Sequence, residues 1–272
     1  MRAAAKPRPR REAVMLLVQP LADRVVARLA TTRVAPWQVV LSHTLLGFVA
    51  AFLVAGAAPA GWRWAAALLQ LKTVLDNVDG GLARATGRVT EFGRYLDTVC
   101  DLLVNVALFW ALARHGPWLG SAAGCVALTV ALSADFNAER LHREAHAPPR
   151  GATPAVPPGA WPWALSLVRG FYRVVLAPQD RALAALDRRL FALAAGRAWD
   201  GADAGERRRW ADVFSTGALV NLGLSTQYLA LGVALWLGMP YAWVVLSWLL
   251  VPYLLVVQAA RVARYRRAAR AA

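Results

Sequence analysis

The stretch LDNVDGGLARATGRVTEFGRYLDTVCD, residues 75–101, places four aspartates and three arginines in a chain otherwise dominated by alanine, leucine, valine and tryptophan. The aspartates occur in two pairs with helical spacing. Asp76 and Asp79 are three residues apart, and Asp97 and Asp101 are four residues apart. On a helix, the two members of each pair project from one face. The stretch therefore predicts two helices, each presenting two carboxylates on one side.

Glycines between the two pairs predict a turn that reverses one helix into the next: Gly80, Gly81 and Gly87. Two antiparallel helices joined in this way bring the four carboxylates together. Carboxylates that lie so close in low-dielectric surroundings repel one another strongly unless cations lie among them. The simplest arrangement that removes this repulsion is a metal site.

The type of ligand indicates the type of metal. Oxygen ligands favour hard ions such as Mg²⁺, Mn²⁺ or Ca²⁺ over Zn²⁺, and no His or Cys has zinc-ligand spacing to the aspartates. Four carboxylates suffice for two divalent ions, an arrangement that bridges phosphate oxygens and stabilises in-line displacement at phosphorus. Arg84 offers a planar pair of donors for a phosphate, and Gly80 permits close approach of a ligand. We expect a diphosphate as the substrate element.

The composition indicates a membrane protein. Of the 272 residues, 58% are hydrophobic and only 17% are charged, which does not suit a soluble globule. Six apolar windows are long enough to cross a hydrocarbon core as helices. They lie at about 37–57, 62–83, 95–114, 117–136, 213–237 and 240–260. The predicted fold class is all-α, a polytopic membrane protein with six transmembrane helices.

The net charge of +15 would suit a nucleic-acid-binding protein, but its distribution follows the membrane. With six spans, Arg63 and Arg114 fall in short loops on the far side, whereas nearly all other Lys and Arg fall on the side of both termini. By the positive-inside rule, both termini are cytoplasmic. The basic runs then attract anionic lipid, and we expect no nucleic-acid partner.

Two segments are expected outside the spans. Residues 1–34 form a basic N-terminus and an amphipathic interfacial helix, for which packing on the protein surface is the alternative. Residues 35–272 form the membrane catalytic domain, which contains a cytoplasmic insertion at about 137–212. The insertion opens with a Pro- and Gly-rich linker and continues over residues 166–196 as one or two helices too polar to span.

The aspartate stretch resembles the signature of the CDP-alcohol phosphotransferase (CDP-alcohol phosphatidyltransferase) family, which is DxxDGxxAR followed by GxxxDxxxD. Every fixed position of that signature is matched, by Asp76, Asp79, Gly80, Ala83, Arg84, Gly93, Asp97 and Asp101. The resemblance is strong over about 74–105 and extends in outline to the six spans and the interfacial helix. It does not extend to the insertion at about 147–210, whose role it leaves open.

The resemblance implies a homodimeric membrane transferase of phospholipid biosynthesis. Such an enzyme moves a phosphatidyl group from CDP-diacylglycerol to the hydroxyl of a polar alcohol or alcohol phosphate and releases CMP. Asp76, Asp79 and Asp97 match the family's metal ligands, for two ions of Mg²⁺ or Mn²⁺. Asp101 matches the last aspartate, which adjoins the metal as a further ligand and serves as the catalytic base.

The resemblance also implies substrate contacts. Gly80 and Arg84 match the family's donor-binding residues, and Thr90 lies where the family often has a Ser or Thr near the donor. Arg140 and Arg143, just after the fourth span, are candidates for binding the acceptor's phosphate. A plain positive-inside role is the alternative for these two arginines.

The first span departs from the family. Members often begin it with a Pro-Asn-x-x-Thr run that helps to form the nucleotide pocket, whereas the corresponding residues here are Pro36, Trp37 and Val40. His43 lies in the same span. It is interpreted as a hydrogen-bonded buried histidine, with a substrate contact as the alternative.

Other functions are compatible with an aspartate-rich membrane protein. One is a transferase with a CDP-alcohol donor and a lipid acceptor. An aspartate-rich membrane prenyltransferase would show a second Asp-rich motif, and an ion-coupled transporter would show related halves sharing a midplane site. Here the acidic residues of interest lie in one hairpin. We therefore expect a transferase in the plasma membrane, the inner membrane in bacteria, with its active site at the cytoplasmic face.

Overall fold

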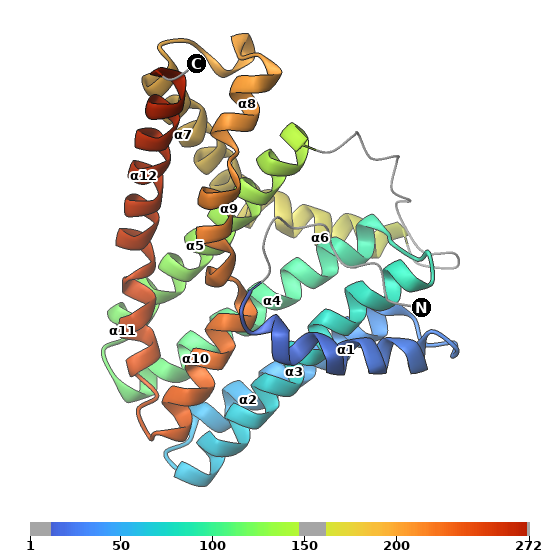
Figure 1. Cartoon of the computed structure of the whole chain (residues 1–272). Helices are drawn as coiled ribbons and strands as arrows, with labels where there is room; N and C mark the ends of the chain where they lie inside the picture. The colour runs from blue at the N-terminus through green and yellow to red at the C-terminus, as the bar shows by residue number, and fades with distance from the viewer. Residues whose placement is uncertain (1–11, 147–161, 271–272) are drawn as a thin grey trace.

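A computed structural model describes residues 12–146 and 162–270 of the chain. Over these ranges the chain forms α-helices and short 3₁₀ turns, with no β-strand (Figure 1). The predicted all-α fold class is confirmed. The basic residues up to position 11 and most of the Pro-rich linker lie outside the described residues.

Five long helices form the first half of the chain. The charged stretch supplies the end of the third helix, the turn after it, and the start of the fourth. The helices are α1 (Met15–Leu29), α2 (Pro36–Ala55), α3 (Pro59–Ala85), α4 (Glu91–Leu112) and α5 (Trp118–His146), with a 3₁₀ turn η1 (Ala113–His115) before α5.

Shorter elements make up much of the second half. Residues 166–196, predicted to form one or two helices, form most of α6 and all of α7. The elements are α6 (Pro162–Val175), α7 (Ala177–Ala195), η2 (Trp199–Gly201), α8 (Ala204–Trp210), α9 (Val213–Leu219), η3 (Val220–Leu222), α10 (Leu224–Trp236), α11 (Ala242–Trp248) and α12 (Leu250–Arg270).

Helix α3 lies at the centre of the packing around the charged stretch. It contacts α1, α2 and α10, while α2 also packs against α4, and α4 packs against α5 and α6. The α2–α4 contact is close because a Cβ added at Gly47 would lie only 2.6 Å from a methyl group of Val104. This packing buries one face of α3 and one face of α4 against α2 and positions the polar residues of the three helices together.

Within residues 12–146 and 162–270, five helical segments are long and apolar enough to span a membrane, so the chain is an integral membrane protein. The segments are Pro36–Ala55, Glu91–His115, Trp118–His146, Ala204–Trp236 and Ala242–Arg270. The region of α3 was predicted to be the second of six spans, but α3 is not among these five segments. Its 27 residues include Arg63, Lys72, Asp76, Asp79 and Arg84, which interrupt its apolar character. The count of six spans stays a prediction.

Helix α1 covers part of α3 and leaves an apolar face uncovered. Ala22 and Val26 are buried, and a Cβ added at Gly81 of α3 would lie 2.8 Å from a methyl group of Val26. On the outer face, Leu16 and Leu17 are 81% and 75% exposed. A helix with one face packed on the protein and leucines on the other suits the predicted interfacial position.

A second core joins the predicted insertion to the C-terminal helix. Phe191 of α7, Trp210 of α8 and Tyr265 of α12 pack together. Beside them, the buried Asp187 accepts hydrogen bonds from Arg261 Nη1 at 2.5 Å and from Trp210 Nε1 at 3.1 Å. The end of α12 is therefore held against α7 and α8 by apolar packing and a buried ion pair.

Candidate metal centre

The turn between α3 and α4 brings the two aspartate pairs side by side. Helix α3 runs without interruption to Ala85, and Gly87 in the turn has φ 67°, a left-handed conformation that glycine adopts at little cost. Gly80 and Gly81 were predicted to belong to the turn, but they lie inside α3. Within α3, Gly81 permits the close approach of Val26 of α1, while Gly80 lies beside the Arg84 side chain.

Thr90 begins the second helix of the hairpin. It is the N-cap of α4, where its hydroxyl oxygen accepts a hydrogen bond from the Gly93 backbone N–H at 3.1 Å. A Cβ at Gly93 would lie 3.3 Å from the same oxygen. The motif glycine therefore leaves room for the cap, which fixes the start of the helix that carries Asp97 and Asp101.

Three of the predicted aspartates meet around one histidine of α2. His43 Nε2 lies 2.8 Å from Asp79 Oδ2 and 3.9 Å from an Oδ1 atom of each of Asp76 and Asp97. All four side chains offer one ligand atom within 4.8 Å of one another. This spacing suits a single coordination shell or a shared pair of ions.

The cluster opens toward one side and contains unsatisfied oxygens. The His43 side chain is fully buried and that of Asp79 is 10% exposed, whereas that of Asp97 is 38% exposed. Within the described residues, Asp76 Oδ1 and Asp97 Oδ1 are buried without a hydrogen-bond partner. Buried carboxylate oxygens require a partner, so these residues fit a divalent cation that would bind between the two helices.

The fourth aspartate has a different partner. Asp101 Oδ1 accepts a hydrogen bond from Lys72 Nζ at 2.7 Å, and the same ammonium lies 3.9 Å from Asp76 Oδ1. The Lys72 side chain is fully buried. Asp101 thus adjoins the cluster through Asp76 and Lys72.

Arg84 lies one helical turn beyond Gly80, and the two are neighbours in space. A Cβ added at Gly80 would lie 3.1 Å from Arg84 Nη1. The glycine therefore leaves room for the guanidinium to lie along the helix beside the carboxylates. Arg84 therefore places a planar guanidinium one helical turn beyond the Asp79–Gly80 end of the candidate metal site.

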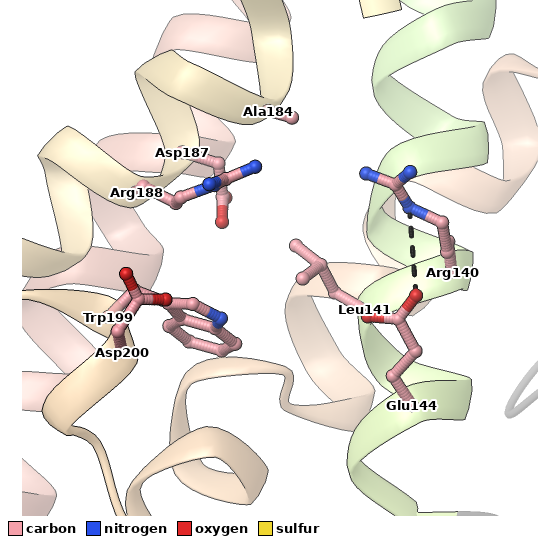
Figure 2. A pocket seen from close by; sticks show the side chains of 8 residues that line it. All are labelled: Arg140, Leu141, Glu144, Ala184, Asp187, Arg188, Trp199 and Asp200. Atoms are coloured by element: carbon pink, nitrogen blue, oxygen red, sulfur yellow. Dashed lines mark ion pairs between the residues drawn. The ribbon is translucent and has the colours of Figure 1, made fainter. Parts of the chain in front are cut away.

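The two candidate acceptor residues lie near the end of α5. Arg140 donates from Nη2 to Asn137 Oδ1 at 2.8 Å, and Arg143 pairs with Glu139 at 3.3 Å. Arg140 and Arg188 of α7 line a cleft of about 320 Å³. Figure 2 shows the two side chains facing each other across it. The remaining residues that line this cleft are Leu141, Glu144, Ala184, Asp187, Trp199 and Asp200. Among the interactions described for the two arginines, none is with an aspartate of the metal centre.

The structure adds His43 and Lys72 to the predicted site. Lys72 had a local signal, because residues 72, 76 and 79 share one face of a helix. His43 had none beyond its presence in an apolar span, since it lies 36 residues from Asp79 in sequence. It adds a nitrogen donor to a set predicted to be oxygen only.

Comparison with known proteins places the same region in one family. The profile of CDP-alcohol phosphatidyltransferases matches residues 34–176, more than half of the 272 residues. The match covers the first four predicted spans and runs through α6 to residue 176. The expectation that the resemblance does not extend to the insertion at about 147–210 is therefore wrong for its first part.

Several relatives share part of the sequence. A bifunctional IPC transferase and DIPP synthase of Aquifex aeolicus is 39% identical over 34% of this chain and 23% of its own length. A phosphatidylinositol phosphate synthase of Cutibacterium acnes is 30% identical over 47% of this chain and 63% of its own. An archaetidylinositol phosphate synthase of Pyrococcus horikoshii is 33% identical over 36% of this chain and 50% of its own length. The chain thus spans less than two thirds of the length of each of these relatives.

Proposed function

The chain belongs to the CDP-alcohol phosphatidyltransferase family, and we propose that it transfers a phosphatidyl group from CDP-diacylglycerol to the hydroxyl of a polar alcohol phosphate, releasing CMP. The observation that carries this proposal is that Asp76, Asp79 and Asp97 meet beside His43, with one oxygen each of Asp76 and Asp97 buried without a hydrogen-bond partner. A membrane enzyme with this activity would make a phospholipid. Membership of this family is not expected of a prenyltransferase or an ion-coupled transporter.

The proposed cofactor is Mg²⁺ or Mn²⁺, as two ions held by Asp76, Asp79 and Asp97. When bound, such ions neutralise charge on the donor's diphosphate and stabilise the charge that develops during displacement at phosphorus. The exposed side of the cluster, at Asp97, is the side open to a diphosphate. His43 orients the Asp79 carboxylate through its 2.8 Å contact.

The remaining residues bind the donor and accept the proton of the acceptor hydroxyl. Arg84 binds a donor phosphate through its guanidinium, and Gly80 keeps the space beside it clear. Thr90 supports the donor site by capping α4. Asp101 accepts the proton of the acceptor hydroxyl as the oxygen attacks phosphorus, acting at close range as a general base.

The proposed setting is the cytoplasmic face of a plasma membrane, the inner membrane in bacteria, with both termini cytoplasmic. The concentration of Lys and Arg on the side of both termini supports this orientation. We propose two parts, an interfacial segment over residues 1–34 and a catalytic membrane domain over 35–272 with a cytoplasmic insertion at about 137–212. A homodimer is proposed from family membership.

The proposed acceptor class is an inositol phosphate or a similar alcohol phosphate. Two of the relatives are named as inositol phosphate lipid synthases, one of phosphatidyl and one of archaetidyl lipid. Arg140 and Arg143 are the proposed contacts for the acceptor's phosphate. The cleft at Arg140 is lined by a second arginine, Arg188, but also by three acidic residues, Glu144, Asp187 and Asp200, so the proposed phosphate contact rests on the two arginines and not on a net positive cleft.

An acceptor panel tests the proposal. Purified protein in lipid nanodiscs is given CDP-diacylglycerol, Mg²⁺ and one of glycerol phosphate, inositol phosphate, inositol, serine or choline, and CMP is measured. We expect fastest CMP release with an alcohol phosphate and little with the unphosphorylated alcohols. Fastest release with serine or inositol would overturn the acceptor class. Absence of CMP with every acceptor would refute the donor and favour a CDP-alcohol donor with a lipid acceptor.

A further inference from the structure

Lys72 is a buried charge that the family signature does not account for. Its side chain is fully buried within α3, where its buried neighbours along the helix include Ala65, Ala66 and Leu69. Burying an ion pair costs so much desolvation that apolar residues of similar volume are usually no less stabilising. The presence of a lysine here therefore indicates a need for its charge.

The surroundings of Lys72 fix the position of its ammonium. Its Nζ lies 5.0 Å from the centre of the Tyr228 ring, which attracts a cation through its face. The Tyr228 hydroxyl donates to Asn105 Oδ1 at 2.9 Å, and Gln70 Nε2 donates to the Tyr228 carbonyl at 3.0 Å. Contacts from α3, α4 and α10 thus hold the ring beneath the ammonium.

The fixed ammonium binds one particular carboxylate. Lys72 Nζ is 2.7 Å from Asp101 Oδ1 but 3.9 Å from Asp76 Oδ1. Asp101 is also absent from the group of four ligands that lie within 4.8 Å of one another. The cluster is therefore divided into a metal-binding part with His43 and a separate Lys72–Asp101 pair.

We propose that Lys72 is a positioning residue that takes the place of a metal ion at Asp101 and holds this carboxylate as the proton acceptor. This inference rests on the proposed function. Lys72 occupies Oδ1, which leaves Oδ2 of Asp101 for the acceptor hydroxyl. The hydroxyl's O–H electron pair forms the new O–P bond, its proton passes to Asp101, and the broken P–O bond leaves its electron pair on CMP.

Metal binding without substrate tests directly whether the Lys72–Asp101 pair is separate from the metal-binding residues. Mn²⁺ affinity is measured by electron paramagnetic resonance on wild-type protein, Lys72→Met, and the double variant Lys72→Met with Asp101→Asn. In Lys72→Met the freed carboxylate joins the metal site, so affinity rises at least about tenfold. The double variant removes a neutral pair, so affinity stays within about threefold of wild type. Lys72→Met also lowers CMP turnover at least about 100-fold, because Asp101 no longer serves as a base.

A matched control is Arg63→Met, which removes a positive charge from the same helix about 13 Å along its axis from Lys72. It is expected to leave Mn²⁺ affinity unchanged. Unchanged affinity in Lys72→Met, with only a lower melting temperature, would show a purely structural lysine and overturn the inference. A loss of Mn²⁺ affinity of more than about tenfold in the double variant would also overturn the inference, because it would show that Asp101 is a metal ligand.

The double variant keeps the test decisive if Lys72→Met fails to fold, because replacing both members of the pair leaves no buried charge unpaired. The Mn²⁺ measurements need no substrate. If the wild-type protein released no CMP with any acceptor, the proposed function would fail. The affinities would still decide whether Lys72 or a metal ion is the partner of Asp101.

Discussion

Two basic side chains from outside the aspartate motif, His43 and Lys72, contact different members of the cluster. His43 lies closest to Asp79 and Lys72 lies closest to Asp101, while Asp76 Oδ1 lies 3.9 Å from both. Lys72 and His43 therefore offset only part of the repulsion among the four carboxylates. In the described part of the chain, Asp76 Oδ1 and Asp97 Oδ1 are still buried without a hydrogen-bond partner, which suits a bound cation.

His43 offers a prediction at the scale of one residue. Replacing it by asparagine removes the 2.8 Å contact that orients Asp79, so metal affinity should fall about 10- to 100-fold, as for other residues that orient metal ligands. Mn²⁺ binding to the purified variant measures this. His146→Asn is the matched control, since His146 is exposed at the end of α5 and bonds the His142 carbonyl. Equal affinity in both variants would contradict the role of His43.

The sequence predicted the aspartates of the site more completely than their partners. Spacing of three and four residues places each carboxylate pair on one helix face, so the pairs could be predicted without tertiary information. Lys72 stands four residues before Asp76 on the same face and was open to the same argument. His43 reaches the site through the packing of α2 on α3, which depends on side-chain contacts that no local pattern contains.

At the scale of elements, the hairpin of α3 and α4 determines the geometry of the site. The hairpin was predicted from the glycines between the two aspartate pairs, but of these only Gly87 lies in the turn. Gly80 and Gly81 extend α3 instead; at Gly81, close packing against Val26 of α1 compensates for the lower helix propensity of glycine. Similarly, α5 continues to His146, about ten residues beyond the predicted span, as its polar end is stabilised by contacts with α7 and α8.

The contact between α2 and α4 gives a prediction at this scale. In Gly47→Ala the new methyl group would lie 2.6 Å from Val104, forcing the helices apart and costing about 1–3 kcal/mol. Thermal unfolding in detergent should show a lower melting temperature. Because α2 carries His43, Mn²⁺ affinity should fall as well.

Two further variants control this experiment. Adding Val104→Ala removes the clashing methyl groups and should restore most of the lost stability. Gly170→Ala, in α6, places a methyl group where no atom lies within 4 Å, and it should be neutral or slightly stabilising. If Gly47→Ala behaved like Gly170→Ala, the α2–α4 contact would be looser than described.

At the scale of the whole molecule, the chain combines an apolar membrane domain with a polar centre. Five segments suit a membrane by length and composition, while α3 carries the site's Lys72, Asp76 and Asp79 among its apolar residues. Composition and periodicity predicted the membrane class and most helices. They could not predict how the insertion attaches, because the Asp187–Arg261 pair joins residues 74 positions apart in sequence.

The activity proposed for this site is metal-dependent transfer from a CDP-linked lipid. The most direct measurement is ³¹P NMR of the purified protein in nanodiscs with CDP-diacylglycerol and inositol phosphate, before and after chelation of divalent ions. We expect CMP and a new phospholipid to appear in equal amounts, to stop with chelator, and to resume when Mg²⁺ or Mn²⁺ is restored. Product formation that continues at the same rate in chelator, or a donor left intact under every condition, would contradict the account.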